Sequence, residues 1–276
     1  MLKRTLTGAC LIAILLVGFL LRSTVDYKFL DLIVLAVALM ASYEFNTALK
    51  DKTSKAQKIL SITFSGLSVL MAVFFRASLF TFISAYVACS IIYCALSENS
   101  KQIDKIAHFV LSLIYPTVPL LFISLINQMG EISLYALVTM MVTTVMTDTF
   151  AYIVGSKFKG RKLCPNISPN KTVSGALGGL IGGIASGILV YYIFKLCGQN
   201  PFVVQNEISV ILFILSSSAL FSIVTQVGDL FESSLKRSLN VKDMGSLLPG
   251  HGGMLDRVDG LMFNAMAVYL CYVLLV

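Results

Sequence analysis

Charge is scarce in this sequence. Only 13% of its 276 residues are charged, whereas 57% are hydrophobic and the mean hydropathy is +0.86. A soluble globular domain carries about 25% charged residues, so this composition excludes that class. The apolar residues fall in blocks long enough for helices that cross a bilayer, which takes about 20 residues each. The sequence therefore predicts an all-α, polytopic integral membrane protein.

Several familiar motifs are also lacking. The six cysteines form no CxxC pair and no cluster with histidine, so neither a zinc site nor a disulfide framework is indicated. No GxxxxGK motif occurs, which excludes a P-loop. The first apolar run follows Lys3 and Arg4 but precedes no small-residue cleavage site, so we interpret it as a retained span rather than a signal peptide.

Nine apolar runs bounded by charges or turn residues are predicted to span the membrane. They cover residues 5–21, 29–49, 59–77, 78–97, 106–127, 132–154, 172–197, 208–228 and 258–276. Between the third and fourth runs only Arg76 and Ser78 interrupt the apolar character, and merging these runs would give eight spans.

Basic residues set the expected orientation, because loops rich in Lys and Arg stay in the cytoplasm. With nine spans and a cytoplasmic N-terminus, all 21 Lys and Arg residues except Arg22, Lys28, Arg76 and Lys195 fall on the inner side. The C-terminus then lies on the opposite side. The net charge of +7 is thereby explained without a nucleic acid partner. We expect a multi-pass protein of the cell (inner) membrane whose polar segments, 155–171 and 229–257, face the cytoplasm.

Acidic residues stand beside the predicted spans, where charge is costly and is by default a sign of function. Asp256 and Asp259 are three apart at the start of the last span and would share one helix face. Helix capping by Asp256 explains one acid, whereas a divalent cation explains why both stay ionised side by side, and we favour the cation. Asp148, about two turns inside the sixth span, is a further candidate.

Two polar stretches follow the eighth span. GDLFESSLKRSLN, residues 228–240, has no Pro or Gly after its first residue, so the helix can continue and place Asp229, Glu232 and Lys236 on one face. Taken alone, that face is more simply a solvated charged surface. The glycine-rich KDMGSLLPGHGG that follows fits either a phosphate cradle or a tight connection. Lys171, after an SPN turn, is placed to meet an anion or to anchor the seventh span.

Other features look mainly structural. Glycines at positions 175, 179, 183 and 187 recur every four residues, which predicts a close helix-packing face. Glu44, at the inner end of the second span, has a minority chance of lying near a site, and Asp31 a smaller one. His108 is interpreted as an interfacial residue.

The segment SSLKRSLNVKDMGSLLPGHGGMLDRVD, residues 233–259, resembles the signature of the phosphatidate cytidylyltransferase (CDP-diacylglycerol synthase) family. The matching fixed points are Ser233, Lys236, Arg237, Lys242, Asp243, Gly245, Pro249, His251, Gly252, Gly253, Asp256, Arg257 and Asp259. GDLFES, TDTFAYIVG and SPNKTVSGALGG also resemble family segments. The family form of the last is SPKKTxEG, so Asn170 and Ser174 depart from it and no carboxylate stands at 174. The resemblance covers the C-terminal half, and the first five spans match only in being apolar.

This resemblance implies transfer of the cytidylyl group of CTP to phosphatidic acid, giving CDP-diacylglycerol and pyrophosphate at the cytoplasmic face. It implies Mg²⁺, alone or with a second cation, held by Asp148, Asp229, Asp256 and Asp259. The implied catalytic residues are Asp229, Asp256, Asp259, Lys236 and Arg237. The implied substrate contacts are Lys171, Lys242, Arg257, His251, Gly252, Gly253 and Ser168. Five N-terminal spans (1–130) would then precede a catalytic region (131–276), and the chain could form a homodimer.

Two other functions remain alternatives at this stage. A polytopic transporter also shows intramembrane acids and glycine packing faces, but it needs polar sites near the middle of the membrane. Here nearly all charge lies at the inner ends of the predicted spans. A CTP-dependent lipid or polyprenol kinase also has to bind CTP and a lipid substrate. It would not be expected to carry the whole pattern from Ser233 to Asp259.

Overall fold

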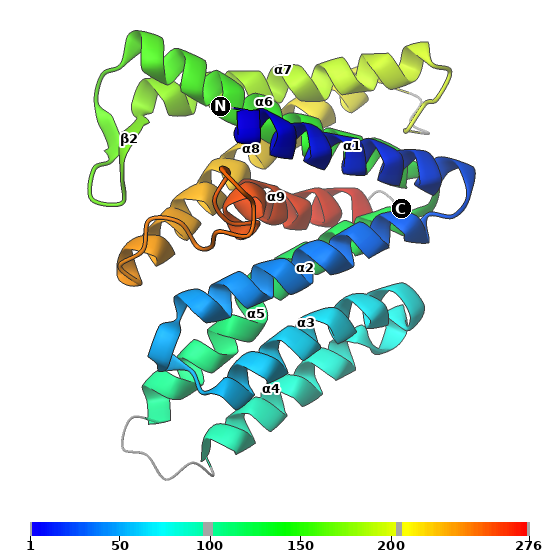
Figure 1. Ribbon diagram of the computed structural model, residues 1–276. Coiled ribbons are helices and arrows are strands. Elements are labelled where there is room, and N and C mark those ends of the chain that lie inside the picture. Colours follow the sequence, from blue (N-terminus) through cyan, green and yellow to red (C-terminus); the bar gives the residue numbers. More distant parts are fainter. Residues whose placement is uncertain (1, 96–101, 203–205, 275–276) are drawn as a thin grey trace. The chain divides into compact units, whose positions relative to one another are not determined.

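The computed structural model describes residues 2–95, 102–202 and 206–274. Within these ranges it contains nine α-helices and one two-stranded hairpin (Figure 1). The helices are α1 (Leu2–Thr24), α2 (Lys28–Ala48), α3 (Lys55–Phe74), α4 (Leu79–Ala95), α5 (Gln102–Asn127), α6 (Ser133–Phe158), α7 (Val173–Leu196), α8 (Glu207–Ser238) and α9 (Leu255–Val273). The predicted helical class is confirmed, and each predicted span coincides with one helix.

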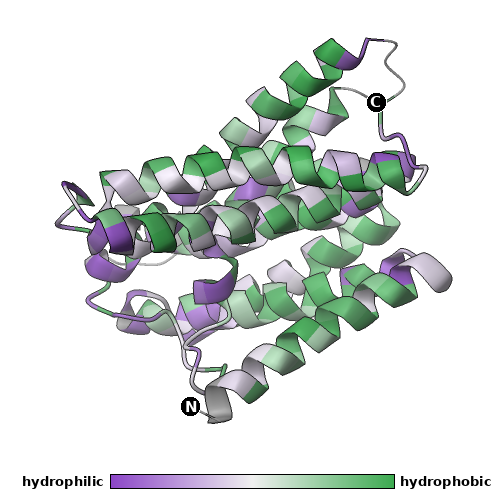
Figure 2. Cartoon of the chain, turned by 90° about the horizontal axis from the view of Figure 1, so that it is seen from above, coloured by the Kyte–Doolittle hydropathy of each residue, from purple (hydrophilic) through white to green (hydrophobic). Residues whose placement is uncertain are grey.

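Most of the described helices suit a bilayer. Seven of them, namely α1, α2, α3, α5, α6, α7 and α8, are long and apolar enough to cross one. The apolar stretch of α4 is shorter, Leu79–Tyr93, and α9 carries three charged residues near its start. Hydrophobic residues cover the helices, and hydrophilic residues gather at helix ends and in connecting loops (Figure 2). The chain is thus a membrane protein, while the total of nine spans and their orientation stay predictions.

The hairpin corrects one local prediction. Strands β1 (Lys162–Cys164) and β2 (Ser168–Thr172) pair antiparallel, with Lys162 opposite Thr172. The sequence predicts a turn at SPN, and this is wrong, because Ser168, Pro169 and Asn170 lie within β2. Each strand of a two-stranded ribbon has one unpaired edge, so proline's missing N–H is tolerated there. The hairpin leads directly into α7, where the Thr172 side chain caps the helix.

Packing divides the chain into two compact units. The first comprises residues 1–125 and 239–257, and the second comprises residues 126–238 and 258–276. The first unit therefore contains α1 to α5 and the segment that leads into α9, here called the 239–257 segment. The second contains α6, the hairpin, α7, α8 and most of α9. The sequence predicts a functional division into N-terminal spans (1–130) and a catalytic region (131–276). This division stays a prediction.

In the first unit, α2 packs against α1 and α3, and α3 packs against α4. The aromatic core of this unit joins α3, α4 and α5, with Phe64, Phe109 and Leu113 fully buried. Tyr86 stacks on Phe64 with ring centroids 3.9 Å apart. At the start of α3, Ser54 and Gln57 form a reciprocal capping box. These contacts fix the N-terminal helices as a packed group.

In the second unit, α7 packs closely against α6 and α8 through small residues. The predicted packing face is confirmed, because all four of its glycines are buried. A Cβ atom on Gly183 would lie 2.5 Å from the Cβ of Ser222 on α8, and one on Gly175 would lie 2.8 Å from the carbonyl oxygen of Ala151 on α6. Helices in lipid usually associate through close approach of their backbones. Burial of apolar surface contributes little to this association, because the lipid tails are themselves apolar.

Helix α9 is tied into the second unit by a buried amide. Asn264 is fully buried, and its Nδ2 donates to the carbonyl oxygen of Met140 (3.0 Å) and to Oγ1 of Thr144 (2.9 Å), both on α6. A buried polar side chain is stable only when it is hydrogen-bonded, so this contact fixes the rotation of α9. That rotation determines which way Asp259, five residues earlier on the same helix, points.

Candidate functional site

A cavity of about 440 Å³ opens in the second unit, between α6, the hairpin, α7 and α8. Its polar lining includes Asp148 from α6, Lys171 from β2 and both Gln226 and Asp229 from α8. Lys171 Nζ and Asp229 Oδ2 form an ion pair at 2.5 Å, and both side chains stay about one third exposed (27% and 33%). A nucleotide-sized ligand could therefore reach both charges.

The glycines of α6 and α7 place Lys171 in this cavity. A Cβ on Gly155 would lie 3.0 Å from Oγ1 of Thr172 and 3.2 Å from the Cα of Gly175, so the end of α6 and the start of α7 nearly touch. Oγ1 of Thr172 accepts from the amide of Gly175 at 3.1 Å and ends β2 at the first turn of α7. Lys171, one residue earlier, is thereby held at the mouth of the cavity.

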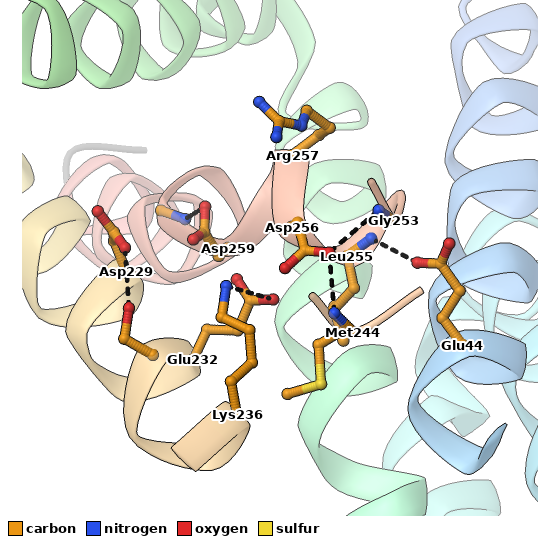
Figure 3. Close-up of polar contacts among 12 residues, drawn as sticks. Glu44, Asp229, Glu232, Lys236, Met244, Gly253, Leu255, Asp256, Arg257 and Asp259 are labelled. Carbon is orange, nitrogen blue, oxygen red and sulfur yellow. Dashed lines mark hydrogen bonds and ion pairs between the residues drawn. The ribbon is translucent and has the colours of Figure 1, made fainter. Parts of the chain in front are cut away.

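Helix α8 carries a row of charged side chains on one face, as the sequence predicts. Oδ1 of Asp229 accepts from Oγ of Ser233 (3.5 Å), and Lys236 Nζ lies 3.5 Å from Oε1 of Glu232 (Figure 3). Glu232 is completely buried, which rules out the simpler interpretation of this face as a solvated surface. Burying a carboxylate costs much free energy unless it is paired, so the ion pair with Lys236 is what makes burial of Glu232 tolerable.

The second unit holds four carboxylates, Asp148, Asp229, Glu232 and Asp259, each of which lies close enough to at least one of the others for their charges to interact. The charges of Asp229 and Asp259, together with the ammonium group of Lys171, act on Asp148. Asp259 interacts with Asp229, Glu232 and Lys236, and its Oδ1 accepts from the amide of Gly260 at 2.8 Å. This unit therefore brings together five of the predicted site residues: Asp148, Lys171, Asp229, Lys236 and Asp259.

Arg237 and Ser168 lie at the hairpin end of the same unit. Nε of Arg237 donates to the carbonyl oxygen of Ile167 at 3.2 Å, the residue immediately before Ser168. The contact joins the last turn of α8 to the tip of the hairpin, and the Arg237 side chain stays exposed. An exposed guanidinium with donors in a fixed fork is well suited to phosphate oxygens.

The 239–257 segment brings together the remaining predicted residues in the first unit. Asp256 Oδ2 accepts from the amides of Met244 (2.9 Å) and Gly253 (3.0 Å), so one carboxylate oxygen holds both sides of the loop (Figure 3). Arg257 Nε donates to the carbonyl oxygen of His251 at 3.1 Å. Lys242 is exposed.

The PGHGG turn closes on itself. Leu248 donates its N–H to the carbonyl of Gly252 (3.0 Å), and His251 donates to the carbonyl of Leu248 (2.9 Å). Gly250 and Gly252 adopt positive φ angles of +79° and +83°, a conformation that other residues rarely take. The amides of Leu248, His251 and Gly253 are thus used within the protein, which makes this turn a shaped element rather than a row of open amide donors.

Two acids that sequence reasoning placed outside the site lie within these contacts. Glu44 of α2 is 2% exposed, and its Oε2 accepts from the amide of Leu255, the first residue of α9 (2.9 Å). Glu232 is the second. In both cases the sequence shows a carboxylate at the inner end of a predicted helix. Such a position suggests a function, but it does not identify the group that the carboxylate contacts.

The acidic residues can be compared with the needs of Mg²⁺. In the described ranges, no three His, Cys, Asp or Glu side chains gather as a ready-made metal centre. Mg²⁺ in nucleotide sites is usually held by one or two carboxylates, several waters and substrate phosphates rather than by an all-protein cage. Asp229, within electrostatic reach of Asp148 and Asp259, fits that pattern.

These features define a class: a helical membrane protein with an open cavity that is lined by two carboxylates, Asp148 and Asp229, and by the ammonium group of Lys171. The model of the cytidylyltransferase family matches residues 2–275 of this chain. The chain belongs to this family, and the match extends well beyond the C-terminal half in which the resemblance was detectable from motifs.

Curated relatives agree with this assignment. A phosphatidate cytidylyltransferase of Thermotoga maritima is 32% identical over 93% of this chain and 92% of its own length. One from Bacillus subtilis is 34% identical over 62% of this chain and 60% of its own length. One from Rickettsia typhi is 41% identical over 43% of this chain and 50% of its own length.

Proposed function

We propose that this chain transfers the cytidylyl group of CTP to phosphatidic acid, giving CDP-diacylglycerol and pyrophosphate. The observation that carries the proposal is its relationship, over nearly its whole length, to a phosphatidate cytidylyltransferase. The arrangement of charge supports the same chemistry, because Asp148, Lys171 and Asp229 of one unit line an open cavity.

The reaction joins two anions. A phosphate oxygen of phosphatidic acid forms a bond to the α-phosphorus of CTP, the bond from that phosphorus to the β-phosphate oxygen breaks, and pyrophosphate leaves with the electron pair. The attacking oxygen is already ionised, so a strong general base is unnecessary. The main demand on the protein is to hold and neutralise phosphate groups that repel each other.

The basic residues predicted from the sequence would carry out that task. Lys171, Lys236 and Arg237 would bind phosphate oxygens in the second unit, with Ser168 beside them at the hairpin. Lys242 and Arg257 would do so from the 239–257 segment, where His251, Gly252 and Gly253 give the turn its shape. When Lys171 contacts a phosphate, its pair with Asp229 opens and releases that carboxylate.

Mg²⁺ would be held by Asp229 and Asp259, with Asp148 and Asp256 as further ligands and a second cation as an alternative. The ion supplies positive charge that offsets the charge building up on the transferred phosphate and the leaving pyrophosphate. Asp256 has a second task, because its Oδ2 already joins Met244 to Gly253. Its metal role therefore depends on the other oxygen.

A double-label assay tests the proposed function. Purified protein in detergent is given phosphatidic acid, Mg²⁺ and CTP labelled either at the α- or at the γ-phosphate. We expect α-label in the lipid and γ-label in pyrophosphate, in equal amounts, with no product after chelation of Mg²⁺. Label from the γ position in the lipid would instead identify a CTP-dependent kinase. No labelled lipid, together with solute flux in proteoliposomes, would identify a transporter.

A further inference from the structure

The contacts of Glu44 connect the N-terminal helices to a loop that is more than 200 residues away in the sequence. Glu44 lies in the last turn of α2, and its Oε2 accepts the N–H of Leu255 at 2.9 Å (Figure 3). Both residues belong to the first unit. Leu255 begins α9, so the carboxylate sits at a helix N-terminus, where negative charge is stabilised by the helix dipole.

The same side chain passes between two loop glycines. A Cβ on Gly245 would lie 2.5 Å from Cγ of Glu44, and one on Gly253 would lie 2.6 Å from Oε2 of Glu44. No real side chain tolerates such distances, so these positions have to be glycine as long as Glu44 occupies the space. Gly245 is thus explained by a residue outside the family-like segment, whereas a Cβ on Gly253 would also lie 2.8 Å from the backbone nitrogen of Gly245.

Burying the Glu44 carboxylate costs free energy, which suggests that its contact with the loop has a function. Glu44 is 2% exposed, and in the described part of the chain its Oε1 has no hydrogen-bond partner. A buried carboxylate with one unsatisfied oxygen is destabilising on its own. The hydrogen bond from the amide of Leu255, at the start of α9, offsets part of this cost.

A second N-terminal helix contacts the middle of the same segment. Thr7 of α1 donates its hydroxyl to the carbonyl oxygen of Pro249 at 3.0 Å. A Cβ on Gly8 would lie 3.6 Å from Nε2 of His251, so α1 runs directly against that ring. The PGHGG turn and the start of α9 are therefore both fixed by helices that carry no recognisable motif.

We propose that Glu44 is a positioning residue that holds the 239–257 segment in the shape that binds the nucleotide. The role of α2 is then to present this carboxylate, with α1 supporting the turn. The expected effect of a Glu44 substitution on turnover rests on the proposed function. Its expected effect on the shape of the loop does not. Glu44 acts through Leu255 and the loop, without touching the reacting atoms.

The experiment compares Glu44→Ala with Glu44→Gln, which keeps an oxygen acceptor of the same length. Trypsin cleavage after the exposed Lys242 reports opening of the loop. We expect Glu44→Ala to be cleaved about tenfold faster, since hydrogen bonds to charged groups contribute roughly 1.5–3 kcal/mol. We also expect its KM for CTP to rise by about tenfold, with an unchanged KM for phosphatidic acid. Glu44→Gln should stay near the parent in both measurements.

Asp31→Asn is the matched control, because Asp31 is also a buried acid of α2 (3% exposed) but lies 13 residues earlier, roughly 20 Å along the helix. It should change neither trypsin cleavage nor the KM for CTP.

Equal effects of Asp31→Asn and Glu44→Ala, or parent-like cleavage of Glu44→Ala, would overturn the proposal. If the parent protein forms no labelled lipid, the proposed function fails while the cleavage experiment still decides the role of Glu44.

A double-mutant cycle keeps the test decisive if Glu44→Ala folds poorly. The three atoms nearest to a Cβ on Gly245 all belong to Glu44. Gly245→Ala should therefore lower the thermal midpoint in the parent protein but much less in the Glu44→Ala background. Additive effects would contradict the contact.

Discussion

At the residue scale, Lys171 and Asp229 give the candidate site its resting state. Their ion pair joins β2 to α8, and it balances one acid of a group that also contains Asp148 and Asp259. Because both partners are about one third exposed, the pair is weak enough to open when a phosphate competes for the lysine. We therefore expect this ion pair to open when substrate binds.

Replacing Asp229 by Asn tests this exchange. The change removes the negative charge that would attract a cation and leaves Lys171 without its partner, but it preserves shape. We expect turnover of CTP and phosphatidic acid to fall by about two orders of magnitude or more, with a thermal midpoint close to that of the parent. Glu131→Gln, which alters an exposed acid of the same unit, should leave turnover unchanged. Retained activity in Asp229→Asn would exclude its metal and catalytic roles.

Asp256 differs from Asp229 because its carboxylate has two tasks that one substitution can separate. An Asn at this position still offers a carbonyl oxygen to the amides of Met244 and Gly253, but it lacks charge. We expect Asp256→Asn to lose activity while trypsin cleavage after Lys242 stays slow. Asp256→Ala should lose activity and also open the loop. An active Asp256→Asn protein would limit Asp256 to a structural role.

At the element scale, the glycine face of α7 determines how closely α6 and α8 approach it. Gly183→Ala would place a Cβ against Ser222 and interfere with the hydrogen bond from Thr147 to Ser222 (3.0 Å). Overpacking of this kind destabilises by about 1–3 kcal/mol, so we expect a lower thermal midpoint in detergent. Leu177→Ala on the exposed face of the same helix (58% exposed) is the control and should have little effect. Equal midpoints for the two variants would refute the tight packing.

Helices were predictable from this sequence and the hairpin was not. Apolar runs of about 20 residues leave a chain in lipid few options other than helix, and Arg76 and Ser78 were enough to predict the break between α3 and α4. The SPN segment carries the residues of a turn, but pairing with β1 overrides that local preference. Short strands depend on a partner segment, which local composition does not reveal.

The candidate site was predictable to a similar extent. Asp256 was proposed from its spacing to Asp259, and Asp229 from the resemblance to the family, and the roles of both stay predictions. The contact between Glu44 and Leu255 was not predicted. An isolated acid in an apolar helix indicates a function, but it does not identify the residue that the acid contacts. Contacts between residues so far apart in sequence come from packing alone.

At the scale of the whole molecule, we propose that the polar loops face the cytoplasm of an inner-membrane protein, and α4 decides whether this topology holds. Its 17 residues extend about 25 Å, slightly less than the hydrocarbon core of roughly 30 Å. If α4 crosses, Arg76 and Glu131 lie on the outer side and Lys159 lies on the inner side. If it does not, Arg76 and Glu131 lie on opposite sides.

Thiol labelling of intact cells distinguishes these cases. In a variant without its native cysteines, Arg76→Cys, Glu131→Cys and Lys159→Cys each introduce one thiol at an exposed position. We expect a membrane-impermeant reagent to label the first two in intact cells and the third only after permeabilisation. Protection of Glu131→Cys together with labelling of Lys159→Cys would show that α4 stays on one side. CTP would then have to reach the cavity at Lys171 and Asp229 from the outer face, where the proposed reaction has no nucleotide supply.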